Sequence, residues 1–189
     1  KANLRLVDCP IRHLGTEKAQ KLYHDIQNWL EKAGVEMHFN AECENIIIED
    51  NECHGVLVRE GGEVREYRAP EIVIATGRRG ADWLESLCAK HNIAHKPGTV
   101  DIGVRVELPA LIFEPITDVV YESKLVYRTK QYGDQVRTFC MNPYGHVVAE
   151  NVEGINTVNG HSYADPALRS ENTNFALLVS NRFTKPFNE

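Results

Sequence analysis

Several features that would indicate a nucleic-acid-binding or membrane protein are missing from this sequence. Its 189 residues contain 21 Lys and Arg against 27 Asp and Glu, and the formal charge of −6 gives no electrostatic reason to bind nucleic acid or an anionic membrane. No apolar run approaches the length that spans a bilayer. We therefore expect neither nucleic acid nor a membrane as partner, and the sequence leaves the oligomeric state unknown.

The cysteines do not form a recognisable framework. There are five of them, widely spaced and without a C-x-x-C, so neither a disulfide framework nor a thiolate zinc site is indicated. Cys88, His91 and His95 have zinc-like spacing but no fourth ligand nearby, so we predict no metal site. A reducing, cytoplasmic location fits this composition best. Because the chain begins at Lys1 without an initiator Met, we expect it to be a piece of a longer protein.

The most informative stretch runs from Glu71 to Arg78. Its three consecutive β-branched residues, Ile72–Ile74, are too few for a buried helix and fit a strand buried on both faces. Ala75, Thr76 and Gly77 then leave room for a bulky group to approach the backbone. In open α/β sheets, ligands lie beyond the carboxyl ends of strands, and a nucleotide is the usual ligand. The alternative is that this is an ordinary buried strand ending at a glycine-containing turn.

The pattern around this stretch predicts a helix, strands and a closing helix. The first helix begins at Thr16, a suitable N-cap, and ends before Gly34, a typical C′ residue. Its apolar residues recur at helical spacing, so one face should be buried, with Tyr23 and Trp29 as packing groups. Strands are expected over residues 35–39, 44–49, 55–59 and 64–68, the last three forming an antiparallel meander, and a helix over residues 81–91.

The remainder of the chain changes character and predicts a second, sheet-rich domain. We expect strands near residues 102–106, 124–128, 136–140, 147–149 and 172–180. Pro109–Pro115 is a Pro-bounded segment, and Asn142–Gly145 and Asn159-Gly160 indicate turns. The predicted fold class is therefore α/β to α+β, with one domain over residues 1–94 and the other over residues 95–189.

These motifs resemble FAD-dependent oxidoreductases of the glutathione-reductase-like flavoprotein fold. Residues 72–78 are similar to the ATG motif of that fold, and the segments before them resemble its middle portion. Residues 103–109, 138–143, 157–162 and 174–180 resemble the substrate domain of uncharacterised bacterial FAD-dependent dehydrogenases, and His13–Thr16 resembles the loop that opens their helix. The resemblance implies part of a Rossmann-like FAD-binding domain with an antiparallel β-meander, followed by an incomplete, sheet-rich substrate domain.

The resemblance also implies FAD as the cofactor of the full-length protein and assigns residues to its site. Backbone groups near Cys43 would meet the adenine, and Ala75, Thr76 and Gly77 would pass close to the adenosine and pyrophosphate. Arg78 would meet a phosphate or the flavin, with a solvated arginine as the alternative. The substrate-side candidates are Arg105, Cys140, Asn159, His161 and Ser162, each with a structural alternative, and the catalytic residues stay unknown.

Two functions remain open at this point. The first is a flavin oxidoreductase, a dehydrogenase that acts on a small-molecule substrate of unknown identity and for which NAD(P)H as reductant is undetermined. Because the pyrophosphate-binding G-x-G-x-x-G turn does not occur in the sequence, the resemblance places it upstream of Lys1, and we expect this chain alone to be inactive. The alternative is a non-catalytic two-part β-rich module that binds a protein partner, which an exposed apolar patch would favour.

Overall fold

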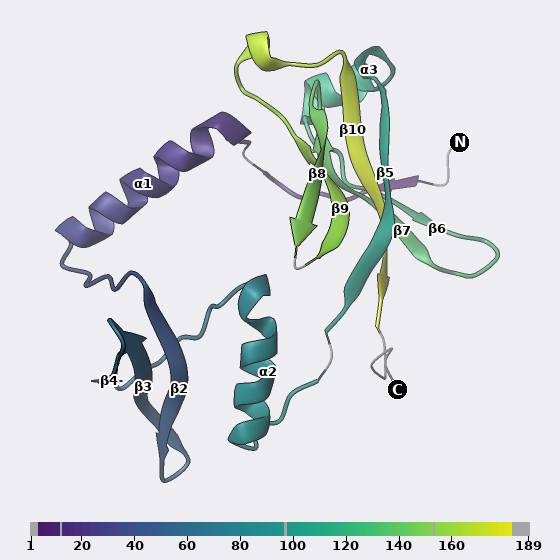
Figure 1. The fold of residues 1–189 in the computed structure, drawn as a ribbon. Coiled ribbons are helices and arrows are strands. Elements are labelled where there is room, and N and C mark those ends of the chain that lie inside the picture. The colour runs from purple at the N-terminus through teal and green to yellow at the C-terminus, as the bar shows by residue number, and fades with distance from the viewer. Residues whose placement is uncertain (1–3, 12, 97, 153, 183–189) are drawn as a thin grey trace. The chain divides into compact units, whose positions relative to one another are not determined.

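The computed structural model describes residues 4–11, 13–96, 98–152 and 154–182, and these form a mixed α/β fold dominated by antiparallel strands (Figure 1). The chain divides into two compact units, one made of Lys1–Asn28 with Pro97–Glu189 and the other of Trp29–Lys96. We call them the sheet unit and the meander unit. This division differs from the predicted one, in which residues 1–94 formed one domain. The expected mixed α/β class with antiparallel sheets is compatible with the structure.

The meander unit contains the predicted three-stranded antiparallel sheet. Its strands β2 (Ala41–Glu49), β3 (Glu52–Glu60) and β4 (Glu63–Arg68) lie in sequence order. Asp50, Asn51, Gly61 and Gly62 all have positive φ, which the tight two-residue turns of hairpins require. A 3₁₀ turn at Arg78–Gly80 leads into helix α2 (Ala81–Lys90), as predicted. Buried apolar side chains from β2, β3 and α2 form the core of this unit: Ile46, Val58 and Leu87.

Two expected strands of this unit do not form. Residues 35–39 and 71–76 have no regular secondary structure, and Val73 is 88% exposed. A β-branched run becomes a strand only when a neighbouring strand pairs with its backbone groups. No strand of the described residues pairs with either segment. The prediction of a buried strand at Ile72–Ile74 is therefore wrong for this structure, although Gly77 does end the segment with a φ of 65°.

Helix α1 (Thr16–Lys32) confirms the predicted helix, and Gly34 follows it with a φ of 87°. Its predicted buried face is wrong, because no residue of α1 is buried. Tyr23 is 71% exposed and Trp29 is 67% exposed, so neither is a packing group here. Apolar spacing was enough to predict the helix, but it does not specify what covers the apolar face.

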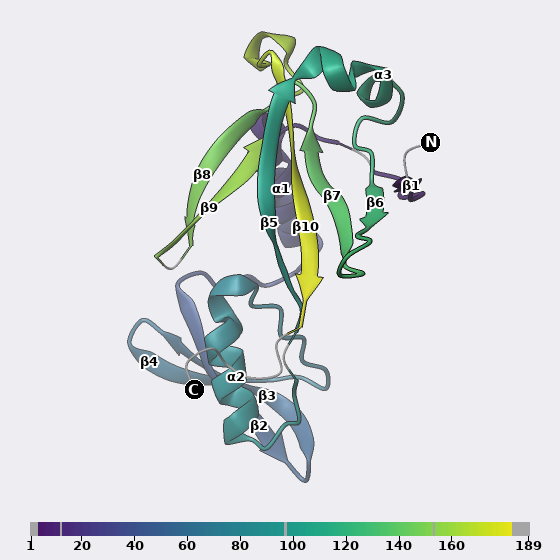
Figure 2. The ribbon, with the colours of Figure 1, turned by 90° about the vertical axis from the view of Figure 1, so that its right-hand side faces the viewer.

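The sheet unit is built on a five-stranded antiparallel sheet in the order β1-β6-β7-β10-β5 (Figures 1 and 2). Its strands are β1 (Leu4–Leu6), β5 (Val100–Pro109), β6 (Leu125–Arg128), β7 (Gln135–Asn142) and β10 (Asn172–Asn181). A separate hairpin of β8 (His146–Val152) and β9 (Ile155–His161) contacts β7 and β10. β10 lies between β5 and β7 and pairs with both of them.

Two segments of the sheet unit differ from the prediction. The Pro-bounded segment is mostly helical, because helix α3 (Ala110–Val120) begins directly after Pro109 and contains Pro115. A proline removes one helical hydrogen bond, and this penalty hid the helix in the sequence. Asn159 and Gly160 do not form a turn but lie inside β9, paired with β8. The expected turn at residues 142–145 does form, since Gly145 N donates to Asn142 O at 3.2 Å.

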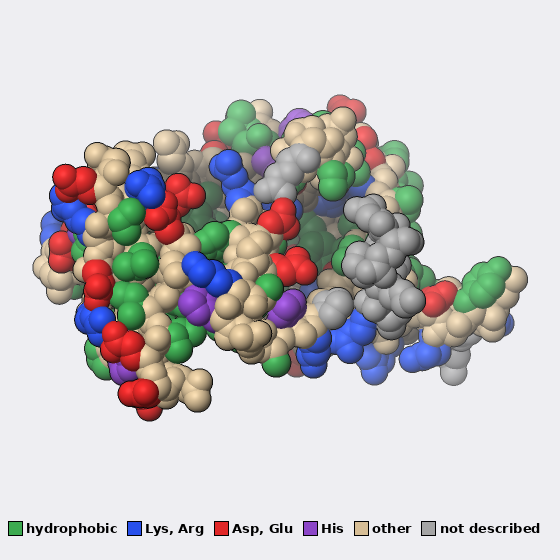
Figure 3. Space-filling view, turned by 60° about the horizontal axis from the view of Figure 1, so that its bottom comes forward, with side chains coloured by type: hydrophobic (Ala, Val, Ile, Leu, Met, Phe, Trp, Pro, Cys, Tyr) green, Lys and Arg blue, Asp and Glu red, His purple; other side chains and the backbone are tan. Residues whose placement is uncertain are grey.

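The surface offers charged groups of both signs. On the face drawn in Figure 3, acidic and basic side chains are interspersed with hydrophobic ones. Within the described ranges, no helix is both long and apolar enough to cross a membrane. All five cysteines are free thiols.

Candidate functional site

A polar cluster lies where β5, β7, β9 and β10 of the sheet unit meet, and its centre is the carbonyl oxygen of Cys140. Arg105 Nη1 and Nη2 donate to this oxygen at 3.2 and 3.0 Å, and Asn142 Nδ2 donates to it at 2.7 Å. Cys140 has a φ of 48°, a left-handed conformation that is uncommon for a residue other than glycine. The three hydrogen bonds to one oxygen hold Cys140 in this conformation.

Gly160 allows the side chains of this cluster to pack closely together. A Cβ atom at residue 160 would lie 2.5 Å from Arg105 Nη2 and closer still to Asn142 Nδ2 and Asn174 Oδ1. Asn174 is 0% exposed, and its Oδ1 accepts a hydrogen bond from Asn142 Nδ2 at 3.4 Å. Only glycine leaves room for the three side chains to converge at this point of β9.

The cluster contains a positive charge without a counter-ion in the described part of the chain. Arg105 makes no ion pair there, and its buried Nε has no hydrogen-bond partner. Asn174 Nδ2 is likewise buried without a partner in the described residues. Buried polar atoms normally have a hydrogen-bond partner. These two N–H donors therefore mark a site that could bind a further hydrogen-bond acceptor.

The thiol of Cys140 connects this cluster to a cavity. Cys140 Sγ lies 3.8 Å from Asn159 Oδ1, and Asn159 Nδ2 donates to Glu150 Oε1 at 3.0 Å. Cys140 also lines a cavity of about 280 Å³, together with Cys9, Ile11, Glu122, Lys124 and Phe139. A neighbouring cavity of about 520 Å³ shares four of these residues. Together they have the size of a small-molecule site.

A second cluster joins three side chains from distant parts of the sequence: His13, Tyr121 and Ser162. His13 Nε2 and Ser162 Oγ are 3.0 Å apart, and Ser162 Oγ and Tyr121 Oη are 2.8 Å apart. The rings of His13 and Tyr121 stack with centroids 4.5 Å apart. Ser162 is only 1% exposed, whereas His13 is exposed. The hydroxyl group of a buried serine thus connects an exposed imidazole to a half-buried phenol.

The loop that carries His13 is fixed to the segment after β9. Thr16 N donates to Ser162 O at 3.0 Å, and Glu17 Oε1 accepts from Ala164 N at 2.9 Å and from Asp165 N at 3.1 Å. Burial of Glu17 would raise its pKa, but the backbone N–H groups that bond its carboxylate outweigh this and lower the pKa. The carboxylate at the start of α1 therefore locks the two segments together while ionised.

The electrostatic surroundings keep both rings of this cluster neutral. Burial lowers the pKa of His13, and the carboxylates of Glu17 and Glu122 and a hydrogen bond with the Ser162 backbone oppose that shift only in part. Burial raises the pKa of Tyr121, while its hydrogen bond with Ser162 acts in the opposite direction. Both shifts in pKa favour the neutral forms of the imidazole and the phenol.

The structure brings together most of the predicted substrate-side residues. Arg105, Cys140 and Asn159 belong to the first cluster and Ser162 to the second. His161 joins neither, and it pairs with His146 through the backbone of the β8–β9 hairpin. Sequence reasoning missed four members of the two clusters: His13, Tyr121, Asn142 and Asn174. The sequence contained a signal for His13, because the segment His13–Thr16 resembles the loop that opens the helix in the flavoprotein family.

The predicted cofactor residues lie in the meander unit and leave free the groups that a nucleotide needs. Cys43 is in β2, an edge strand of its sheet, next to a register shift between Cys43 and Asn45. Burial raises the pKa of the Cys43 thiol, which donates to Asn45 O at 3.6 Å, and the outer backbone edge of β2 offers further hydrogen-bonding groups.

The segment 75–78 also leaves space and polar groups available to a ligand. Gly77 has φ 65° and ψ −162°, a region that glycine alone occupies easily, and no atom lies within 4 Å of where its Cβ would be. Thr76 packs against Gly80, whereas Arg78 forms no ion pair within the described residues. Open space beside Gly77, a free guanidinium group and a free strand edge fit a dinucleotide such as FAD.

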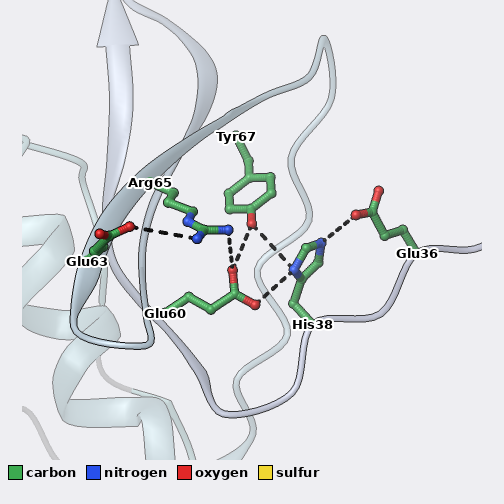
Figure 4. Close-up of polar contacts among 6 residues, drawn as sticks. All are labelled: Glu36, His38, Glu60, Glu63, Arg65 and Tyr67. Carbon is green, nitrogen blue, oxygen red and sulfur yellow. Dashed lines mark hydrogen bonds and ion pairs between the residues drawn. The ribbon is translucent and has the colours of Figure 1, made fainter.

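A third polar cluster lies on the surface of the meander unit (Figure 4). His38 Nε2 is 3.1 Å from Glu36 Oε1 and His38 Nδ1 is 3.3 Å from Glu60 Oε1. Tyr67 Oη donates to Glu60 at 3.1 Å, and Arg65 lies 3.5 Å from the same carboxylate. Hydrogen bonds from His38 and Tyr67 lower the pKa of Glu60. These contacts tie the irregular 35–39 segment to the β3–β4 hairpin.

The residues with zinc-like spacing have other partners. His91 Nε2 lies 2.7 Å from Asn45 Oδ1, and His95 Nδ1 lies 3.2 Å from Ile93 O. Among the described residues, no group of three or more His, Cys, Asp or Glu side chains could hold a metal ion.

Comparison with known proteins gives a relative and a matching family model. An uncharacterised protein of Clostridium beijerinckii is 27% identical over 179 residues, which cover 89% of this chain and 32% of that protein. The chain thus spans about a third of the length of this relative. Residues 10–100 match the family model of an FAD binding domain, and this match supports FAD as the cofactor and a flavin-dependent oxidoreductase domain.

Proposed function

We propose that the full-length protein is an FAD-dependent dehydrogenase that acts on a small molecule in a reducing, cytoplasmic compartment. The observation that supports this most is the family match over residues 10–100, which includes all the predicted cofactor residues. Two polar clusters and a cavity in the sheet unit provide a candidate substrate side. The five free thiols agree with a reducing compartment.

The meander unit would hold part of the cofactor. The backbone edge of β2 near Cys43 would bond the adenine, and Gly77 would let the nucleotide approach the chain closely. Arg78 would neutralise a phosphate by charge-assisted hydrogen bonds. When bound, FAD supplies the two-electron chemistry, while the protein binds it, orients it and excludes competing reactions.

We further propose that the exposed run Ile72–Ile74 is a strand of a Rossmann-like sheet in the full-length protein. The exposure of Val73 supports this proposal, because a run of three β-branched residues is rarely left in water. The length of the relative supports it as well, since that protein has room for strands that could pair with this segment.

The visible absorption spectrum of the purified full-length protein tests the proposed function. We expect a yellow protein with one FAD per chain, identified after release by denaturation. Adding NADH or NADPH without oxygen should bleach the band if a nicotinamide nucleotide is the reductant. A colourless protein that takes up no added FAD would contradict the proposal.

One observation favours the non-catalytic alternative. Helix α3 exposes large apolar side chains, with Leu111 75% and Val119 81% exposed, and exposed apolar patches often mark protein interfaces. A partner-binding module would bind its partner equally well without flavin, so the same spectrum separates the two functions.

A further inference from the structure

We propose that Cys140 and Cys9 form a reversible redox site in the sheet unit, where their thiols react with a low-molecular-weight disulfide and become linked to each other. Both residues line the same cavity of about 280 Å³. No other cysteine of the chain lies in this unit, since the remaining three belong to the meander unit. The site therefore lies within one unit, and its chemistry needs no flavin.

A bulge in β7 turns Cys140 toward this cavity. Successive side chains of a regular strand point to opposite faces, yet the neighbours Phe139 and Cys140 both line the cavity. In the pairing of β7 with β10, Phe139 is opposite Ala176 and Asn142 is opposite Asn174, so β7 has one residue more than β10 over this stretch. Cys140 lies in it and has a φ of 48°. Because a β-bulge re-aims a side chain, the backbone itself presents Cys140 to the cavity.

The first polar cluster holds Cys140 in this conformation. A left-handed backbone is unfavourable for a residue with a side chain, and it persists only where the surrounding contacts enforce it. Arg105 and Asn142 supply these contacts through their three hydrogen bonds to the carbonyl oxygen of Cys140. Backbone strain of this kind gathers at functional sites. Presentation of the Cys140 thiol gives the strain, and the polar cluster that maintains it, a function.

Two groups beside the cavity can interact with a negatively charged sulfur, which is the form that attacks a disulfide. Asn142 Nδ2 donates to Cys140 Sγ at 3.6 Å. Lys124 also lines the cavity, with its Nζ 5.7 Å from the centre of the Phe139 ring, and it forms no ion pair among the described residues. Glu122 is the other charged residue of the lining, and its carboxylate acts on both rings of the second cluster.

Cys9 supplies the accessible thiol of the pair. It is exposed, and residues 7–11 have no regular secondary structure. The segment begins beside β6, where Val7 N donates to Lys124 O at 3.0 Å, and its residues also line the neighbouring cavity of about 520 Å³. A disulfide needs its two Cα atoms about 4.4–6.8 Å apart. Residues 7–11 can adjust to this requirement, whereas Cys140 is fixed in β7.

The reaction balances with a small disulfide as the oxidant. The Cys9 thiolate attacks one sulfur of that disulfide, whose S–S bond breaks, and one small thiolate leaves. The Cys140 thiolate then attacks Cys9 Sγ in the mixed disulfide, and the second small thiolate leaves. Two protein thiols are thereby oxidised to one disulfide, the small disulfide is reduced to two thiols, and the protons of the protein thiols pass to the released thiolates. An excess of small thiol reverses both steps.

The link acts as a redox switch for the cavity. It ties the 7–11 segment to β7 across the space that both thiols line, and so reduces the room for any other small molecule. Disulfides in a reducing compartment are usually transient and are often redox sensors. The dithiol is therefore the resting state, and the disulfide forms when the ratio of small disulfide to small thiol rises.

Alkylation rates of the single cysteines test whether the thiol of Cys140 faces the cavity. The full-length protein is pulsed with N-ethylmaleimide, and mass spectrometry of the digest gives the rate for each site. Lys124→Met should slow the reaction of Cys140 by about twofold to fivefold, as expected for one partly exposed charge. Lys130→Met, which removes an exposed charge outside both cavities, is the matched control and should leave the rate unchanged. A Cys140 that is not alkylated in the folded protein would overturn the proposal.

Treatment of the full-length protein with glutathione disulfide tests the link itself. After the remaining thiols are blocked, we expect the digest to contain a Cys9–Cys140 peptide pair that dithiothreitol separates. Cys140→Ser should stop at the mixed disulfide on Cys9, while Cys88→Ser, a change in the meander unit, should form the link as wild type does. Circular dichroism of each variant shows that it is folded. A folded wild-type protein without the linked pair would overturn the proposal, whether or not the protein binds flavin.

Discussion

Replacing Gly160 with alanine tests whether the first polar cluster is as closely packed as the structure indicates. The added Cβ would lie 2.5 Å or less from polar atoms of Arg105, Asn142 and Asn174. None of the three side chains can move away freely. Arg105 and Asn142 share the carbonyl oxygen of Cys140, and Asn174 is fully buried in strand β10.

The expected loss of stability has two parts. Forcing one extra methyl group into a packed site costs about 1–3 kcal/mol. Displacing Asn142 or Asn174 to relieve the clash breaks their hydrogen bond and leaves a buried polar atom unsatisfied, which costs about 1–3 kcal/mol more. We therefore expect Gly160→Ala to lower the free energy of unfolding of the sheet unit by roughly 2–6 kcal/mol.

Urea denaturation followed by circular dichroism would measure this loss. Gly98→Ala is the matched control, since nothing lies within 4 Å of its Cβ position, and it should change stability by no more than about 0.5 kcal/mol. A loss below about 1 kcal/mol in Gly160→Ala would refute the close packing of this cluster.

Three further predictions follow from the meander unit. Gly77→Val should lower the FAD content of the full-length protein more than Gly77→Ala does, because both share the backbone strain and only valine adds bulk; equal losses would remove Gly77 from the cofactor site. Because the folded-state pKa of Glu60 is lowered, its contribution to stability is present above the unfolded pKa of about 4.3 and is lost as the pH falls through the folded value. Denaturation midpoints from about pH 6 to about pH 3 should thus fall less in Glu60→Gln than in wild type, with Glu85→Gln, whose carboxylate makes no described contact, behaving like wild type. Calorimetric titration of the 189-residue chain with FAD should show no micromolar binding. The sequence has no G-x-G-x-x-G turn to bind the pyrophosphate. The remaining neutral contacts do not offset the free energy of roughly 4 kcal/mol or more that is lost when the ligand is immobilised.

Elements with complete local signals could be predicted from the sequence. Helix α1 begins at Thr16, as the sequence indicates, and Gly34 with its positive φ follows the end of the helix, while two-residue turns with positive φ separate the strands of the meander. Elements that depend on a distant partner could not be predicted in the same way. The run Ile72–Ile74 has strand propensity, but a strand forms only where another strand pairs with it. The prediction that one face of α1 is buried was wrong for the same reason, because periodicity indicates an apolar face but not which element packs against it.

The candidate site was predicted where its residues sit on paired strands. Arg105 and Ala176 are register partners in β5 and β10, and Ala176 pairs in turn with Phe139 of β7. A register shift between β10 and β7 then brings Cys140 into the left-handed conformation that places its carbonyl before Arg105. Polar residues at strand ends are a local signal, so the residue types could be named in advance. The bulge that makes them converge is not visible in the sequence.

His13 shows why the second cluster could not be predicted. It lies 149 residues from Ser162, and their contact depends on two pairings that no local pattern reveals. β1 pairs with β6, which brings the segment before His13 alongside β6, and the backbone of Thr16 then bonds to Ser162 after β9. Each pairing is weak evidence alone, but both converge on one buried hydroxyl group.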